Sequence, residues 1–253
     1  MKNLRLSKLL LASVISTLTV PTFAQQLEEV VVTASKRAEN LQDIPQAVTA
    51  FSSERLVELG IVETSDLMGA IPNIQVTSAY GRTQPNFSIR GISVANEFSA
   101  ATASPVGVYV DEVYQSFRAS HGQQLFDLES VEVLRGPQGT LYGRNTTGGA
   151  VNVNTVKPSL DGGTSGFLNV RLGNYSYADF TGAVEATIIP DVLGVRLSGA
   201  VSEADGYVDN TLLGTDHPQT SSTAGRLSVV WRPSEKTDIH AKVYWAENDP
   251  RQD

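Results

Sequence analysis

The sequence predicts a small α+β domain followed by antiparallel strands of an incomplete transmembrane β-barrel. Residues 40–158 mix short strand signals with short helix signals, whereas residues 159–253 alternate apolar and polar side chains with almost no helix signal. No segment after residue 24 resembles a membrane-spanning helix, so any insertion into a membrane has to use β-strands.

Residues 1–24 have the features of a secretory signal peptide. A basic start precedes an apolar core at residues 9–20, and small residues precede the cleavage site after Ala24. The apolar core is shorter than the ~20 residues that a spanning helix needs, which disfavours the alternative of an uncleaved anchor helix. We therefore expect an exported chain whose mature form begins near Gln25.

The composition narrows the class of protein. The chain has 253 residues, a net charge of −8 and no cysteine. The acidic balance argues against nucleic acid as a partner, and the lack of cysteine excludes thiol catalysis and cysteine metal sites. His121, His217 and His240 show no metal-ligand spacing, and no serine, histidine and carboxylate set suggests catalysis. We therefore expect no enzyme, no bound metal and no cofactor.

A run of valines lies in the polar segment of residues 25–39. The run, residues 28–34, is a short strand-forming stretch close to the expected cleavage site. An extended peptide at such a position can add itself as a strand to the sheet of a partner, with affinity coming from main-chain hydrogen bonds. We therefore expect another protein to bind this segment.

Short elements follow in order through residues 40–158. Ser52 and Ser53 can cap a helix that runs to Leu59, and a second short helix starts at Thr64 and stops before Pro72. The strand candidates are rich in β-branched or aromatic residues and are bounded by Gly, Pro or Asn. They are Gln46–Phe51, Asn86–Arg90, Val106–Val110, Ser130–Leu134 and Ala150–Thr155. A helix or turn is expected around Gln123–Phe126.

Five segments of the last region alternate with a period of two, with one apolar face and one polar face. They are Phe167–Gly173, Asp179–Ile188, Leu193–Ser202, Gly225–Arg232 and Asp238–Ala246. This pattern suits a sheet between lipid and a wet lumen, and Trp231 and Trp245 lie near strand ends, where an aromatic belt would sit. A soluble β-sandwich would also alternate, with its apolar side turned inward.

Loop lengths favour the barrel over the sandwich. The connections at residues 189–192 and 233–237 are tight, whereas residues 203–222 form a long polar connection, and short turns on one rim with long loops on the other are typical of outer-membrane barrels. Five strands cannot close a barrel, since such barrels have eight strands or more. We therefore expect the sequence to be a truncated piece of a longer protein.

Five ordered motifs resemble those of TonB-dependent outer-membrane receptors, over nearly the whole chain. Glu29–Ala34 resembles the TonB box, Asp66–Ile74 the "DLL..IPGV" segment, Phe87–Gly91 the "F-x-I-R-G" strand, Val106–Val113 the "VGVYVDGV" segment, and Ser130–Gly143 with Thr147–Val153 the longest signature of the plug domain. One departure is Glu112, which stands where the family usually has glycine.

The resemblance implies a plug at residues 40–158 held inside a barrel of about 22 strands, whose first strands occupy residues 159–253. It implies energised uptake of a scarce ligand, most often a ferric siderophore and sometimes cobalamin or an oligosaccharide. The implied partners are outer-membrane lipid and TonB with its inner-membrane energising complex. TonB would pair in the periplasm with the TonB box, which comprises Glu29, Val30, Val31, Val32, Thr33 and Ala34.

Arg90 and Arg135 lie in otherwise apolar strands of the plug, where a charge is costly unless it is paired. In the family, arginines at these motif positions pair with carboxylates on the barrel wall. The resemblance thus implies a releasable latch between plug and barrel, with partners beyond this sequence. The alternative is an ordinary ion pair within the plug, for which Glu132 is the candidate.

Several glycines of the plug motifs suggest tight turns where its backbone packs close to the barrel wall. They are Gly91, Gly136, Gly139, Gly143, Gly148 and Gly149. A phosphate-binding loop is excluded, because no Gly-Lys-Ser/Thr follows and no clear helix opens after the first glycines.

Polar plug loops provide the candidate ligand contacts, namely Tyr80, Arg82, Gln84, Asn96 and Phe98. The alternative is that these residues are solvated loop tips. Two other functions remain open: a stand-alone exported binding module without a channel, and a receptor that also signals to a regulator. The second is disfavoured, because only a few residues separate Ala24 from Glu29 and leave no room for a signalling domain.

Overall fold

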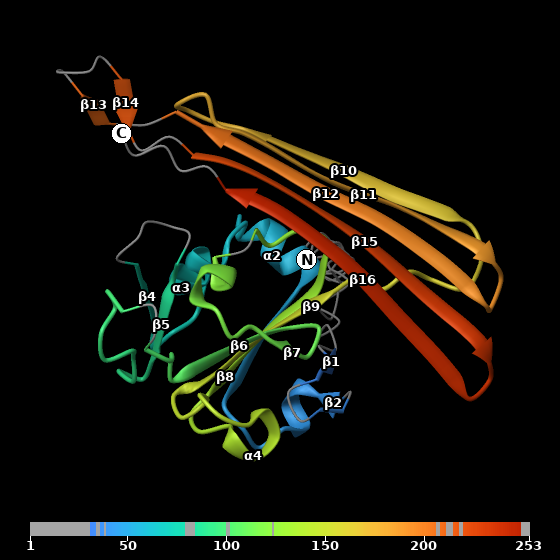
Figure 1. Cartoon of the computed structure of the whole chain (residues 1–253), viewed down its shortest axis with the longest axis horizontal. Helices are drawn as coiled ribbons and strands as arrows, with labels where there is room; N and C mark the ends of the chain where they lie inside the picture. Colours follow the sequence, from blue (N-terminus) through green and yellow to red (C-terminus); the bar gives the residue numbers. More distant parts are fainter. Residues whose placement is uncertain are drawn as a thin grey trace, which may run out of the picture.

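The computed structural model describes residues 31–33, 36–37, 39–78, 84–99, 102–122, 124–205, 208–210, 215–217 and 220–248. The predicted signal peptide lies outside the described residues, as do the predicted site residues Glu29, Val30, Ala34, Tyr80 and Arg82. The described part consists of an α+β domain and a long five-stranded sheet that lies along one side of it (Figure 1).

The main sheet of the α+β domain has the strand order β3-β8-β9-β6-β7. Its strands are β3 (Val48–Ser52), β8 (Leu128–Arg135), β9 (Gly149–Thr155), β6 (Val106–Val110) and β7 (Val113–Tyr114). Only the pair β6–β9 is parallel among these neighbours. A separate hairpin pairs β4 (Ile74–Thr77) with β5 (Asn86–Ile89). Each strand predicted in residues 40–158 is present, with ends shifted by a few residues.

The helices of this domain are short. The Ser52 side chain accepts a hydrogen bond from Arg55 N and begins α2 (Ser53–Glu58), as predicted, and Thr64 begins η2 (Thr64–Asp66) and α3 (Leu67–Ala70). Two further short helices, η1 (Leu41–Asp43) and α4 (Gly139–Tyr142), were not predicted.

Part of the helix or turn predicted around Gln123–Phe126 lies outside the described residues, at Gln123, and residues 124–126 form no helix or turn. The helical turn lies earlier, at η4 (Arg118–His121), and Gln124 forms an isolated bridge with Glu63 instead.

The core of the α+β domain lies between the main sheet and α2, α3 and the β4–β5 hairpin. Phe87, Ile89, Val131, Val133 and Val151 are among its fully buried side chains. These residues come from three strands that lie far apart in the sequence, so the domain depends on long-range packing.

The second part is an antiparallel sheet in which neighbours in sequence are neighbours in space. Its strands are β10 (Thr164–Leu172), β11 (Ala178–Ile189), β12 (Leu193–Ala204), β15 (Thr220–Ser234) and β16 (Thr237–Asn248). All five predicted strands are present. The long connection between β12 and β15 carries a small hairpin of β13 (Val208–Asn210) and β14 (Thr215–His217).

The two faces of this sheet have opposite environments. The apolar face is exposed, for example at Phe180 (45% exposed) and Leu197 (56%), whereas polar residues of the other face, such as Asp179 (2%) and Arg196 (7%), are buried. A soluble sandwich would bury the apolar face, so the arrangement favours the predicted lipid-facing strands. In the described part of the chain, no helix has the length and apolar character needed to cross a membrane.

Candidate functional site

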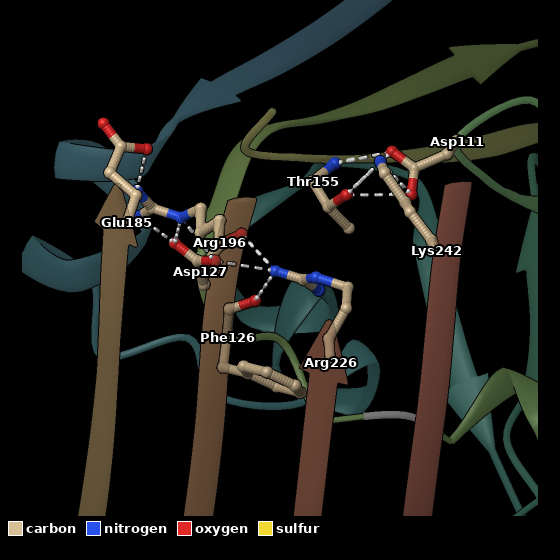
Figure 2. A network of polar contacts seen from close by, with 8 residues as sticks. All are labelled: Asp111, Phe126, Asp127, Thr155, Glu185, Arg196, Arg226 and Lys242. Carbon is tan, nitrogen blue, oxygen red and sulfur yellow. Dashed lines mark hydrogen bonds and ion pairs between the residues drawn. The ribbon is translucent and has the colours of Figure 1, made fainter. Parts of the chain in front are cut away.

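An ion-pair cluster joins the α+β domain to the polar face of the sheet, with Asp127 at its centre (Figure 2). Asp127 directly precedes β8 and has a positive φ of 52°. Its Oδ2 accepts hydrogen bonds from Nε of Arg196 and from Nη2 of Arg226, each at 3.0 Å. Arg196 also donates from Nη1 to Oε2 of Glu185 at 2.7 Å. The cluster therefore ties the domain to β11, β12 and β15.

Aromatic and small residues surround this cluster. Nη2 of Arg226 also donates to the backbone carbonyl of Phe126, and its guanidinium carbon lies 4.9 Å from the centroid of the Phe126 ring. The same ring stacks on Tyr244 and packs against Ala200 and Ala224. The apolar packing excludes water from the ion pairs, which strengthens their electrostatic attraction.

The environment of Asp127 favours its ionised form. Burial by itself would raise the pKa of this carboxyl, but hydrogen bonds and charge from Arg196, together with the charge of Arg226, outweigh burial and lower the pKa. Asp127 therefore stays ionised at neutral pH.

A second ion pair joins β16 to the turn between β6 and β7. Nζ of Lys242 lies 2.8 Å from Oδ2 of Asp111 and donates to Oγ1 of Thr155 at 2.6 Å. The Asp111 carboxylate also accepts the backbone N–H of Thr155 at 2.9 Å. Figure 2 shows that Lys242 extends toward Asp111 and Thr155 from the strand next to the strand of Arg226. In the ion pairs between the domain and the sheet, the carboxylates are Asp127 and Asp111 of the domain, and the cations belong to the sheet.

The two arginines of the predicted latch lie away from the described strands of the sheet. Arg90 follows β5, is exposed and has a positive φ of 53°, so it does not lie within a strand as predicted. Arg135 ends β8 and is half-buried, and its buried Nε has no hydrogen-bond partner among the described residues. Within that part of the chain, neither arginine forms an ion pair with the sheet.

In the described part of the chain, Glu132 forms no ion pair with Arg90 or Arg135, so the alternative of an ion pair within the plug is not found there, and a place for Glu132 in the latch stays a prediction. Glu132 is fully buried inside the domain, where its Oε1 accepts the backbone N–H of Thr33 at 2.7 Å and the Thr33 hydroxyl at 3.0 Å. The physical reason is register: alternate residues of β8 face opposite sides of the sheet, and the side of Glu132 is covered by the N-terminal segment rather than by the five-stranded sheet.

The structure describes what surrounds the glycines of the plug motifs within the domain, and their packing against a barrel wall stays a prediction. A Cβ on Gly149 would lie 2.3 Å from the carbonyl oxygen of Leu134, and its φ is 152°. Gly136 has a φ of 103° and lies beside Arg90. Gly91 and Gly143 also have positive φ, Gly148 packs against Ile92 and Val106, and Gly139 starts α4 without close neighbours.

The described candidate ligand residues lie on exposed or half-exposed loops. Phe98 is 74% exposed, Asn96 accepts a hydrogen bond from Phe98 N, and the Gln84 carbonyl accepts one from Ser78. Arg118 holds part of this region in place, because it donates to the side chain of Asn86 and to the carbonyls of Glu97 and Ser99. Sequence reasoning did not single out Arg118.

Sequence reasoning also missed the pairs around Asp127 and Asp111. The available signal was the set of charged residues on the polar faces of the alternating strands, at Glu185, Arg196, Arg226 and Lys242. Their partners on the α+β domain follow only from the three-dimensional arrangement.

Comparisons with known proteins agree with this fold. Residues 40–150 match the TonB-dependent Receptor Plug Domain. The chain is 33% identical over 151 residues to the pesticin receptor of Yersinia pestis, which covers 57% of this chain and 22% of that protein. It is 28% identical over 252 residues to the probable TonB-dependent siderophore receptor PirA of Acinetobacter baumannii, which covers 92% of this chain and 31% of that protein.

A solved structure shows the same arrangement of elements. The ferric yersiniabactin uptake receptor FyuA from Yersinia pestis matches with a TM-score of 0.72 at 25% identity, over 79% of this chain and 31% of that chain. The chain thus spans between 22% and 31% of the length of these relatives. All three are receptors rather than enzymes by name, in agreement with the sequence-based exclusion of an enzyme. The predicted fold, a plug domain followed by antiparallel strands, is confirmed.

Proposed function

We propose that the chain belongs to an outer-membrane transporter for a ferric siderophore or a similar small ligand, a proposal supported by the match of residues 40–150 to the TonB-dependent Receptor Plug Domain. One observation carries this proposal: the plug is held by ion pairs to the polar face of a sheet whose other face is apolar and exposed. Such a sheet separates lipid from a wet lumen, and the plug occupies the lumen side. The names of the relatives support the class of ligand.

The polar contacts of the plug suit a domain that has to move. Water in the lumen can hydrate the cations of the sheet, Arg196, Arg226 and Lys242, when they separate from Asp127 and Asp111. An apolar interface would instead expose its buried apolar surface to water and lose all the free energy of that burial. We propose that force applied from the periplasm rearranges the plug by breaking these pairs.

The segment Glu29–Ala34 is the proposed handle for that force. We propose that TonB pairs with it as an added strand in the periplasm, and that the inner-membrane complex pulls through TonB. The extended backbone of Val31–Val32 supports this role, since these two residues already form a short strand, β1, paired with β2 (Glu39–Asn40).

Arg90 and Arg135 remain candidates for a latch to carboxylates elsewhere in the barrel. The buried Nε of Arg135, which has no hydrogen-bond partner among the described residues, supports this role, because a buried donor without a partner is costly. The exposed loops that carry Gln84, Asn96 and Phe98, with the neighbouring Tyr80 and Arg82, are the proposed contacts for ligand on the extracellular side.

Uptake by a full-length receptor that contains this chain tests the proposal. A strain that lacks its own siderophore receptors would express it and be given radioactive iron loaded on yersiniabactin, on ferrioxamine B or on a catecholate. Accumulation of iron from at least one chelate, dependent on TonB, is the expected result. Binding of a chelate without TonB-dependent accumulation would instead favour an exported binding module.

A further inference from the structure

One buried arginine holds three segments of the plug together. Arg118 is only 5% exposed, and its guanidinium donates to Oδ1 of Asn86 at 2.6 Å and to the backbone carbonyls of Glu97, at 3.2 Å, and Ser99. Asn86 begins β5, Glu97 and Ser99 lie in the loop that follows β5, and Arg118 begins η4. One side chain therefore fixes the β4–β5 hairpin, the loop of residues 96–99 and η4 relative to one another.

The acceptors of Arg118 are neutral oxygens. In the described part of the chain, no carboxylate forms an ion pair with this side chain. A buried charge is costly unless hydrogen bonds compensate for its lost hydration, and hydrogen bonds from a charged donor are roughly twice as strong as those between neutral groups. The guanidinium thus depends on the carbonyls of residues 97 and 99, and the backbone of the loop is held at both of these points.

A hydrogen bond from the hairpin holds the same loop. Oγ1 of Thr77 donates to Oε1 of Glu97 at 2.7 Å, and Thr77 is the register partner of Asn86 at the loop end of β4 and β5. Glu97 is therefore attached to β4 by its side chain and to Arg118 by its carbonyl. The three hydrogen bonds from Arg118 and the one from Thr77 together form a brace for residues 96–99.

The core of the plug anchors this brace. Oγ1 of Thr64 donates to the backbone carbonyl of His121, the last residue of η4, at 2.6 Å. The His121 side chain is buried, and its ring centroid lies 6.5 Å from that of the core residue Phe87. Arg118 therefore extends toward the loop from a helical turn that is itself packed on the core.

The braced segments carry exposed aromatic side chains. Phe98 lies between the two braced carbonyls and is 74% exposed, and Phe117, directly before Arg118, is 62% exposed. An exposed ring has little packing to fix its place, so its position follows from the backbone that carries it. A backbone that is held in place before binding lowers the entropy cost of forming a complex.

We propose that Arg118 is a positioning residue, which holds the backbone on both sides of Phe98 so that this ring and that of Phe117 are in place before a ligand arrives. The identity of the ligand as a ferric chelate rests on the proposed function, but the brace itself does not. If the loop loosens, the fraction of molecules with the rings in place falls, and the apparent affinity for ligand falls with it.

A spin label on the loop measures the brace without any ligand. The chain has no cysteine, so Phe98→Cys in a cysteine-free full-length receptor provides one exposed labelling site. Arg118→Lys keeps the charge but replaces the planar set of donors by a single ammonium group, and is expected to increase the mobility of the label in the EPR spectrum of isolated outer membranes.

Arg55→Lys is the matched control, since Arg55 is an exposed arginine that pairs with Glu58 on α2. It is expected to leave the spectrum unchanged. Equal mobility of the label in Arg118→Lys and in this control would overturn the inference.

Thr77→Val tests the brace even if Arg118→Lys fails to assemble in the membrane. It removes the hydroxyl that contacts Glu97 at an exposed position and leaves the core of the plug intact. A smaller increase in mobility is expected, because the contacts of Arg118 remain. If Arg118→Lys does not assemble, an unchanged spectrum in Thr77→Val would overturn the inference.

Ligand affinity, measured with Phe98 in place, separates positioning from a general loss of stability. For ferric yersiniabactin, ferrioxamine B or a ferric catecholate, whichever the wild type binds, Arg118→Lys is expected to raise Kd about tenfold, as when the competent fraction falls to about a tenth. In a receptor with Phe98→Ala, Arg118→Lys is expected to cause little further loss, because Arg118 acts through that ring.

An unchanged Kd in Arg118→Lys, or losses that add in full in the double variant, would overturn the inference. Failure of the proposed function looks different. A more mobile label in Arg118→Lys, in a receptor whose wild type binds none of the three chelates, would support the brace and overturn the ferric chelate as ligand.

Discussion

Asp127 shows how one carboxylate can join the plug to the five-stranded sheet. Asp127 forms ion pairs with Arg196 and Arg226, which lie on neighbouring strands. The Asp127 side chain is fully buried, and the side chains of both arginines are nearly so. Because the charges sit in a water-poor contact, removal of one member leaves the others uncompensated. The plug therefore depends on this residue more than on any exposed ion pair.

Replacement of Asp127 by asparagine is expected to weaken docking of the plug by about 3–5 kcal/mol, because Arg196 and Arg226 lose their counter-charge. The full-length receptor would be compared with its variant by the rate of limited proteolysis of the plug and by urea denaturation. The control is Arg232→Gln, which breaks the exposed pair with Asp238 on the same sheet and is expected to change neither measurement. Equal resistance of all three proteins would contradict the role of Asp127.

Low pH is expected to remove the same stabilising contribution of Asp127 to docking of the plug. The pKa of Asp127 is lowered in the folded protein, so its stabilising effect is fully present above the ordinary aspartate pKa of about 3.9 and is lost as the pH falls through the lowered value. The difference in stability between wild type and Asp127→Asn is therefore expected to be constant above about pH 5 and to shrink below about pH 4. A difference that stays constant down to pH 2 would contradict this assignment.

At the scale of elements, the strands were predictable because their pattern is local. Alternation in β11 or β12 places every second residue on one face, and this could be read from consecutive residues. The residues that contact those faces from other elements were not predictable in the same way. Asp127 and Arg196 are 69 positions apart, and Thr33 and Glu132 are 99 apart, so each pair depends on how whole elements pack.

The motifs were also only partly informative about roles. The resemblance placed Glu132 in a plug motif of the family, but it did not show which face of β8 the side chain occupies. The turn glycines were predicted as close-packing positions, and among them Gly149 lies against the backbone of Leu134 within the plug, whereas nothing lies within 4 Å of a Cβ added at Gly91, Gly139 or Gly143. Motif recognition thus placed the elements correctly, while side-chain partners required the structure.

Gly149 is the glycine whose replacement should matter most. Gly149→Ala would place a Cβ 2.3 Å from the Leu134 carbonyl and is expected to destabilise the plug by about 1–3 kcal/mol or more, through overpacking and an unfavourable φ. Gly139→Ala is the control, because nothing lies within 4 Å of its added Cβ and alanine favours the α4 helix. Thermal unfolding of the two variants should differ clearly, and equal midpoints would contradict the packing described here.

At the scale of the whole molecule, two attachments of the plug are distinct. One is to the wall, through Asp127 and Asp111, and the other is to its own N-terminal segment, through Glu132. Under the proposed function, transport would require both to open in turn: the segment would first become available to a partner, and force on it would then separate the plug from the five-stranded sheet. This order makes the strand-forming segment the point on which the proposed function depends.

Val31→Pro in a full-length receptor tests that point most directly, with Val31→Ala as the control. Proline removes the backbone donor at a position where an added strand needs one, whereas alanine keeps it. The proline variant is expected to bind ferric chelate at the cell surface like wild type but to accumulate no iron, while the alanine variant is expected to retain uptake. Normal iron accumulation by the proline variant would contradict the account.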